Sequence, residues 1–74
     1  MIGKILKYIR KEKKLNQKQL ASIINIAQTT LSGYETNYSN PTYEVIEKIA
    51  TTCDYEIIFR NKITKEEITT KNIN

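Results

Sequence analysis

The sequence predicts a mainly α-helical domain of four short helices, followed by a C-terminal β-strand or hairpin. Three observations support this fold class. Apolar residues recur at helical spacing in several stretches before residue 53, residue types that cap helices or form turns separate those stretches, and "YEIIFR" at 55–60 is aromatic and β-branched. The 74 residues suffice for one domain. We divide it into a helical part, residues 1–53, and a β extension, residues 54–74.

The first helix is expected over residues 2–13. Ile2, Ile5, Leu6 and Ile9 follow the i, i+3, i+4, i+7 spacing of one buried stripe, and the lysines fall mostly on the other faces. Lys13 and Lys14 close this segment, near the negative end of the helix dipole.

The second helix is expected to begin after Asn16, which is a strong N-cap residue. Gln19 stands three residues later, as in a reciprocal capping box. Leu20, Ala21 and Ile24 form the buried stripe. Asn25 tolerates the left-handed conformation and is expected to end the helix.

The third helix, expected over residues 28–36, has a narrow apolar side and a broad, uncharged outer side. With Leu31 facing inward, a rotation of 100° per residue places four small residues outward: Thr29, Ser32, Gly33 and Thr36. Its start at Ala27 lacks the usual capping side chain, a bond worth about 1 kcal/mol. A polar face can simply be solvated, but solvated helices usually carry Glu, Lys and Arg. The absence of these residues before Glu35 favours a recognition surface.

A polar loop that ends at Pro41 leads to the fourth helix. Thr42 can cap this helix, and its buried stripe is Val45, Ile46, Ile49 and Ala50. Asp54 marks the break that follows.

The extension, residues 54–74, begins with a strand at 55–60, and a hairpin turning around Lys65 to Glu67 is plausible. An isolated hairpin is only marginally stable in water, and an unpaired edge invites pairing with another chain. We therefore predict a dimerisation element, with pairing either within or between chains left open.

Composition excludes several classes of protein. The chain has one Cys and no His, which rules out an internal disulfide and argues against a zinc site, other metal chemistry and catalysis. We expect no cofactor and no enzymatic activity. No apolar run is long enough for a membrane span or a signal peptide, and a single Cys suits a reducing compartment, so a cytoplasmic protein is expected.

The positive charge is concentrated in the first half of the chain. Residues 1–36 hold seven Lys or Arg against two Glu, whereas residues 37–74 hold five against six acidic residues. This asymmetry is expected of a surface that faces a polyanion, although a solvated lysine-rich helix would give the same count.

Two short helices joined by a tight turn form a helix-turn-helix unit, here residues 17–24 and 28–36. The major groove of B-DNA admits one helix and presents donors, acceptors and thymine methyl groups. Gln can pair with adenine, and Ser and Thr can bond to several base edges. The uncharged face of the third helix therefore favours base readout over simple solvation.

The stretch "LNQKQLASIINIAQTTLSGYETNYSNPTYEVIEKIA" resembles the helix-turn-helix domain of the Cro/phage-repressor (Xre) family, and the resemblance covers residues 3–53. The matching positions are Leu15, Gln17, Leu20, Ala21, Ile26, Gln28, Leu31, Ser32, Tyr34, Glu35, Pro41, Thr42, Ile49 and Ala50. The resemblance implies a lambda-repressor-like bundle. It also implies a sequence-specific regulator, a repressor, that binds double-stranded DNA as a homodimer.

The resemblance also assigns roles to residues. Gln17 resembles a phosphate-contacting residue that also orients the next helix, and Gln28 resembles a base-reading residue. Arg10 and Glu35 resemble a structural pair that joins the first and third helices. The expected base-reading set is Gln28, Thr29, Ser32 and Gly33. The expected contacts to the DNA backbone come from Gln17, Lys18, Thr30, Thr36, Asn37, Tyr38 and Asn40.

The chain departs from the family pattern in places. Asn25 and Asn37 replace common glycines, and the loop 37–40 lacks basic residues. A strand stands where repressors of this family often have a fifth helix, and it resembles the dimer-forming strand of some antitoxins. An antitoxin that binds a toxin protein as well as its own operator is therefore the alternative function.

Overall fold

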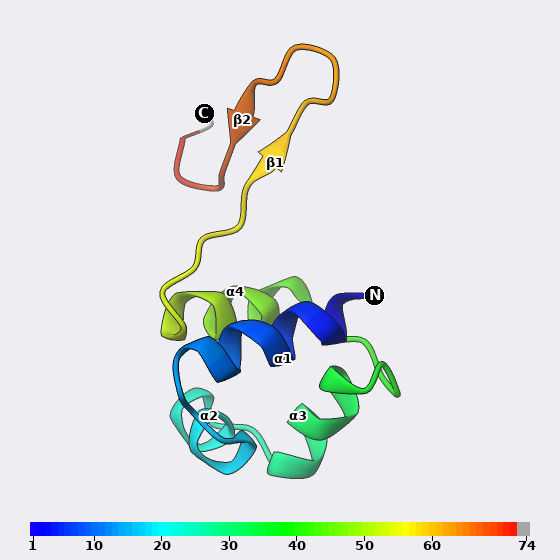
Figure 1. Ribbon diagram of the computed structural model, residues 1–74, viewed down its shortest axis with the longest axis vertical. Coiled ribbons are helices and arrows are strands. Elements are labelled where there is room, and N and C mark those ends of the chain that lie inside the picture. Colours follow the sequence, from blue (N-terminus) through cyan, green and yellow to red (C-terminus); the bar gives the residue numbers. More distant parts are fainter. Residues whose placement is uncertain (73–74) are drawn as a thin grey trace.

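The computed structural model describes residues 1–72 as four helices and a two-stranded hairpin. The elements are α1 (Ile2–Glu12), α2 (Gln17–Ile24), α3 (Gln28–Glu35), α4 (Tyr43–Thr52), β1 (Phe59–Arg60) and β2 (Glu67–Ile68). The helices form a bundle, and the hairpin projects from it at the end away from α3 (Figure 1). The predicted fold class is confirmed. Positions 73–74 of the predicted extension lie outside the described residues.

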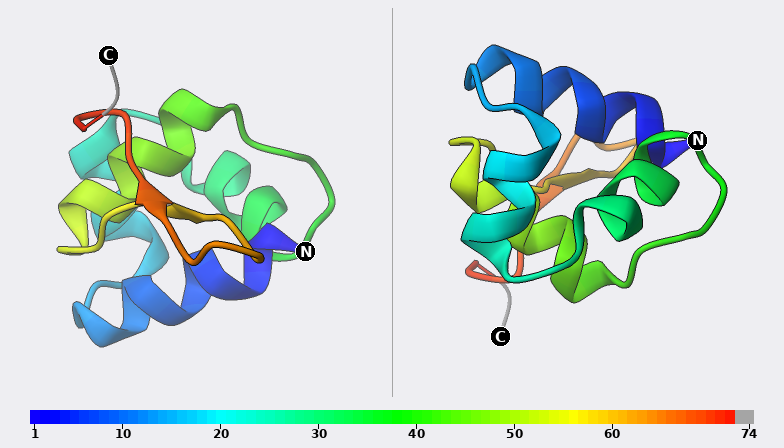
Figure 2. Two further views of the ribbon diagram at one scale, coloured as in Figure 1. Left: turned by 90° about the horizontal axis from the view of Figure 1, so that it is seen from above. Right: turned by 90° about the horizontal axis from the view of Figure 1, so that it is seen from below.

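Each helix contributes one fully buried side chain to the centre of the bundle. These side chains are Leu6, Leu20, Leu31 and Ile49. The smaller buried residues Ala21, Ala50 and Cys53 fill the space around them, as the predicted stripes of the second and fourth helices require. The helices enclose this core together, and Figure 2 shows them from the hairpin side and from the opposite side.

The stripe predicted for α1 is correct except at Ile5. Leu6 and Ile9 are buried and Ile2 is partly buried, whereas Ile5 is 56% exposed. The reason is that α1 meets α3 through Gly3 and Arg10, which turns Ile5 toward the rim of the bundle. Ile5 therefore belongs to an exposed surface.

The predicted caps of α2 and α4 are confirmed, whereas α1 and α3 each end one residue earlier than predicted, at Glu12 and Glu35. Asn16 and Gln19 form the reciprocal capping box, and the side chain of Thr42 accepts a bond from the backbone of Val45. Asn25 adopts the left-handed conformation, with φ 62° and ψ 48°, directly after α2. Ala27 precedes α3 without any side-chain capping bond. These local signals determine where α2, α3 and α4 begin.

Gly3 allows the start of α1 to touch the end of α3, a contact that sequence reasoning missed. A Cβ atom placed on Gly3 would lie 2.4 Å from the backbone oxygen of Tyr34 and 2.6 Å from that of Glu35. The backbone N–H of Gly3 donates to Asn37 Oδ1 at 3.1 Å. Since no side chain fits there, only glycine permits this approach.

The hairpin is shorter than predicted. Pairing joins Phe59 to Ile68 and Arg60 to Glu67, so the predicted strand at 55–60 is wrong for residues 55–58, which form no strand. The predicted turn around Lys65 to Glu67 is also displaced, because the connection spans residues 61–66. Asn61 explains the displacement: its Oδ1 accepts the backbone N–H groups of Ile63 and Thr64, which folds the chain back early.

No helix among the described residues is long and apolar enough to cross a membrane.

Candidate nucleic-acid interface

The turn between α2 and α3 sets the angle of the helix-turn-helix unit. The backbone N–H of Ile26 donates to the carbonyl of Ala21 at 2.9 Å, and Asn25 takes the left-handed conformation that this reversal needs. The Ile26 side chain packs against the core from within the turn. Leu31 is fully buried and anchors α3 beneath its outer face.

The outer face of α3 is polar and uncharged. Gln28, Thr29 and Thr36 are exposed, and Thr30, Ser32 and Gly33 are half-buried. The only charged residue of α3, Glu35, is buried on the same side of the helix as Leu31. The predicted base-reading residues therefore share one surface of a helix at the edge of the bundle.

Thr36 is constrained by its own helix. Its hydroxyl donates to the backbone oxygen of Ser32 at 2.9 Å. A phosphate offers only acceptors, so Thr36 must release this bond before its hydroxyl can donate to DNA. In this conformation the hydroxyl hydrogen of Thr36 is therefore not available to an outside acceptor.

Arg10 and Glu35 form a buried, bidentate ion pair. Nε of Arg10 lies 2.7 Å from Oε2 of Glu35, and Nη2 lies 3.0 Å from Oε1. The two side chains are 7% and 1% exposed. The remaining donor, Nη1, reaches the carbonyl of Leu15 at 2.7 Å, so the guanidinium joins α1 to α3 and to the segment before α2.

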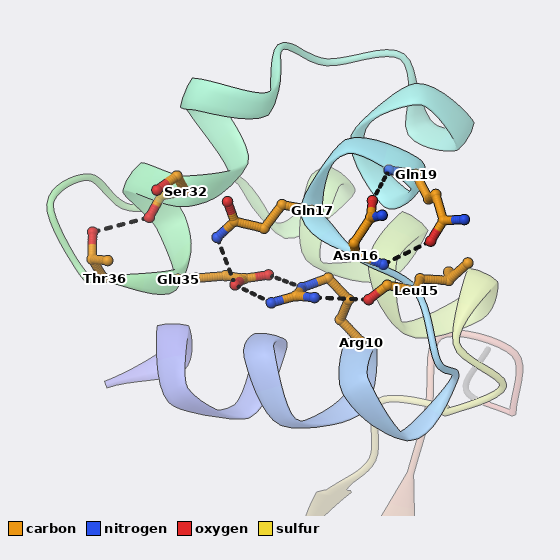
Figure 3. A network of polar contacts seen from close by, with 8 residues as sticks. All are labelled: Arg10, Leu15, Asn16, Gln17, Gln19, Ser32, Glu35 and Thr36. Atoms are coloured by element: carbon orange, nitrogen blue, oxygen red, sulfur yellow. Dashed lines mark hydrogen bonds and ion pairs between the residues drawn. The ribbon is translucent and has the colours of Figure 1, made fainter.

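Gln17 joins this network from the N-terminus of α2. Its Nε2 donates to Glu35 Oε1 at 3.1 Å (Figure 3). The side chain keeps one amide hydrogen and its oxygen for another partner. Sequence reasoning found the ion pair and, separately, Gln17, but it missed that Glu35 joins them. One buried carboxylate thus fixes α1, α2 and α3 relative to one another.

The loop after α3 rests on Gly33. The backbone N–H groups of Tyr38 and Ser39 both reach the carbonyl of Gly33, at 2.9 and 3.3 Å. A Cβ on Gly33 would lie 3.2 Å from Ser39 Oγ, so this glycine makes room for the loop. Tyr38 is 90% exposed and Asn40 is also exposed.

The side chain of Asn37 is hydrogen-bonded within the protein only through its oxygen atom. Its Oδ1 accepts the N–H of Gly3, which leaves the amide NH₂ group available as a donor. Asn37 also takes the left-handed conformation, with φ 63°, where the family pattern has a glycine. The loop can therefore offer neutral donors although it carries no basic side chain.

Most lysines in the first half of the chain are exposed, and one of them forms an ion pair. Lys18 of α2 is exposed, and so are Lys4, Lys7 and Lys11 of α1 and Lys14 in the turn that follows it. Lys13 instead pairs with Asp54 at 2.6 Å, and this hydrogen bond raises its pKa above the ordinary value. The five exposed lysines of α1, the turn after it and α2 can attract a polyanion.

Comparison with known protein families gives a match to a helix-turn-helix family. A family model described as helix-turn-helix, of the Cro/C1 type, covers residues 6–59. No curated protein matches the chain. The family is one of DNA-binding regulatory domains and not of enzymes. The match covers well over half of the chain, including α2, α3, α4 and the greater part of α1, so the chain belongs to the Cro/C1-type helix-turn-helix family of DNA-binding transcription regulators.

Proposed function

We propose that the protein is a sequence-specific repressor that reads the major groove with α3. The observation that carries this proposal is the uncharged outer face of α3, supported from beneath by the buried network of Arg10, Glu35 and Gln17. A helix whose outer face contacts only water usually carries pairs of oppositely charged side chains on that face. Because DNA is its ligand, we expect the protein to act in the cytoplasm.

Base readout would come from the exposed and half-exposed residues at the start and middle of α3. Gln28 is exposed at the first position of the helix, where its amide can pair with both N6 and N7 of an adenine. Thr29 and Ser32 add hydroxyl groups, and the methyl group of Thr29 can contact a thymine methyl. Gly33 lets the backbone of α3 approach the DNA while it also seats the loop.

Backbone contacts would flank this face on two sides. Gln17 and Lys18 lie at the start of α2, and Gln17 is already oriented by Glu35. On the other side, the loop offers the amide of Asn37 together with Tyr38 and Asn40, and α3 itself offers Thr30 and Thr36. Such contacts set the register of the helix on the duplex but carry no sequence information.

The protein would bind as a homodimer. A single α3 reads only a few base pairs, and helix-turn-helix dimers read two half-sites about 34 Å apart. The 54–74 extension is the proposed dimerisation element, because its described part, residues 54–72, is mostly exposed and its hairpin lies away from α3 (Figure 1).

In vitro selection of bound DNA from a random pool tests this function. We expect a symmetric motif whose half-site centres lie about one helical turn apart. Binding that enriches no motif would contradict sequence-specific regulation. A single, non-repeated half-site would retain base readout but contradict the dimer.

An antitoxin function is the second candidate, because the bundle leaves apolar surface uncovered on α2. Ile23 is 57% exposed and lines a hollow together with Leu15. A toxin protein could cover this surface, which Lys18 also lines. Co-expression with the product of an adjacent small gene, followed by recovery of a stable complex, would support this function.

A further inference from the structure

The outer edge of β1 and the segment before it are open to pairing. Tyr55 donates its N–H to the carbonyl of Ala50. In the described part of the chain, Glu56, Ile57 and Ile58 take part in no turn, loop or capping hydrogen bond. Figure 1 shows this segment outstretched between α4 and β1. Phe59 is 61% exposed, so the edge carries both free backbone groups and apolar side chains.

We propose that this edge binds the same edge of a second copy, in antiparallel orientation, with the two-fold axis at Ile58. The inference rests on the proposed homodimer and specifies its surface and register. It would produce a four-stranded sheet in the order β2, β1, β1 of the partner, β2 of the partner.

Backbone geometry restricts the registers that are available. Asn61 donates its N–H to the carbonyl of Glu66 at 2.8 Å, in the same register that pairs Phe59 with Ile68. Odd-numbered residues of β1 therefore turn their N–H and C=O groups toward β2. If this alternation continues, residues 56, 58 and 60 turn theirs toward the open edge. A two-fold pairing must then match even-numbered residues with even-numbered residues.

Charge selects one of these registers. An axis at Ile58 places Glu56 of one copy opposite Arg60 of the other, twice per dimer. Arg60 already lies 3.5 Å from Glu67 across the hairpin, so it would stand between two carboxylates. An axis at Ile57 would instead place Arg60 opposite Asp54, which already pairs with Lys13 at 2.6 Å. An axis at Phe59 would require pairing by residues 61 and 62, where the chain turns away.

The same register collects the apolar side chains on one face. Side chains alternate along a strand and directly paired residues share a face, so Ile57, Phe59 and Ile68 point the same way. Ile57 packs against the helical core, which shows that this face is turned toward the bundle. With the axis at Ile58, Ile57 of each copy would lie opposite Phe59 of the other and extend this face across the dimer.

The helical bundle also exposes apolar side chains on its rim, which the apolar face of the proposed sheet could cover. Gly3 and Arg10 define the side of α1 that contacts α3. Helical rotation places Ile5 and Tyr8 on the other flank, where they are 56% and 60% exposed. An apolar sheet face spanning two copies offers a cover for such residues. It also leaves α3 free, because the hairpin lies at the opposite end of the molecule (Figure 1).

Single cysteines test the register directly, in a Cys53→Ala background that removes the native thiol. In the proposed register, residues 58 of the two copies face each other with Cα atoms about 5.5 Å apart, within the range of a disulfide. Ile58→Cys should therefore cross-link under mild oxidation. Residues 57 would stand diagonally, about 7–8 Å apart, so Ile57→Cys should cross-link poorly. Ile63→Cys, in the exposed connection, is the control for random collision.

A mixing experiment tests the charge pairing. Glu56→Lys and Arg60→Glu each place like charges opposite one another in their own homodimers, and we expect each homodimer to dissociate on the order of tenfold more readily. Mixing the two variants restores opposite charges at both contacts, so the heterodimer should form preferentially. The control is a mixture of Glu66→Lys and Lys62→Glu, two changes in the connection between the strands. This mixture should show no preference for the heterodimer. Sedimentation equilibrium and native mass spectrometry measure these populations.

Several results would overturn the proposal: a monomer at all concentrations, a dimer without cross-linking at residue 58, stronger cross-linking at 57 than at 58, or no heterodimer preference. Helical circular dichroism confirms that each variant is folded. These measurements need no DNA, so they are independent of the proposed repressor function. A dimer of this register that binds no specific DNA would contradict the repressor and leave the interface standing.

Discussion

Two ion pairs show how differently the helical bundle and the hairpin are built. Arg10 and Glu35 meet at 2.7 Å with side chains 7% and 1% exposed, and two further partners complete their bonding. Arg60 and Glu67 meet at 3.5 Å with side chains 63% and 51% exposed. Removal of one partner leaves a buried charge unpaired in the bundle, but only solvated groups in the hairpin. Buried contacts within the bundle thus hold its helices in place, whereas the charged side chains of the hairpin remain exposed and available to a partner.

The largest expected effect comes from Arg10→Met. We expect it to lower the free energy of unfolding by about 3–5 kcal/mol, because Glu35 is left buried without its charged partner. The matched change in the hairpin, Arg60→Met, should cost no more than about 1 kcal/mol. Urea denaturation followed by helical circular dichroism measures both. Equal losses in the two variants would contradict the contrast between the regions, and an unchanged stability and DNA affinity in Arg10→Met would refute the structural pair.

Gly3→Ala tests the contact between α1 and α3. Alanine is the better helix former by about 1 kcal/mol, but its Cβ would meet the backbone oxygens of Tyr34 and Glu35. We expect a net loss of about 1–3 kcal/mol in the free energy of unfolding. Gly33→Ala is the control, because its new neighbour is the movable side chain of Ser39. A more stable Gly3→Ala variant would show that the close approach is not needed.

Ala27→Ser should stabilise the bundle. Ala27 already has the extended conformation of an N-cap residue, with φ −70° and ψ 146°, but it offers no side-chain acceptor. A serine there can accept a backbone N–H of α3, with an expected gain of about 1 kcal/mol. Thermal unfolding measures the gain, and Ala27→Val, which cannot cap, should show none. An unchanged midpoint for the serine variant would mean that α3 needs no cap.

The smallest effect is expected from Phe59→Ala at concentrations where the protein is monomeric. Its side chain is 61% exposed, so the free energy of unfolding of the bundle should change by less than about 0.5 kcal/mol. Leu31→Ala, which empties a fully buried site, should cost about 2–5 kcal/mol. Chemical denaturation of both variants makes the comparison. A large loss in Phe59→Ala would show that the hairpin belongs to the folding unit of the bundle.

The bundle was more predictable from the sequence than the hairpin because its signals are local. The capping box at Asn16 and the left-handed residue Asn25 act on adjacent backbone, so composition and spacing reveal them. The strand at 55–60 was over-predicted because β-branched residues favour extended backbone without specifying a partner. Asn61 displaced the turn through hydrogen bonds that no periodicity reports.

The sequence predicted which residues of the candidate site share the outer face of α3, but not the contacts that hold α3 against the other helices. Helical rotation placed the outer residues of α3 on one face from the sequence alone. The bond from Gln17 to Glu35 and the approach of Gly3 to α3 depend on tertiary packing between segments far apart in the chain. Exposure of Ile5 had the same origin, since the stripe of α1 is wider than the surface that α3 and α4 cover.

The most direct test of the central claim compares Gln28→Ala with Lys18→Ala on the selected DNA site and on scrambled DNA. Gln28→Ala should lower affinity for the selected site by about 1–3 kcal/mol and leave scrambled DNA nearly unaffected. Lys18→Ala should weaken binding to both DNAs alike and reduce the salt dependence by about one counterion. If Gln28→Ala weakens binding to both DNAs equally, α3 does not read bases through this residue, and the proposed recognition face is wrong.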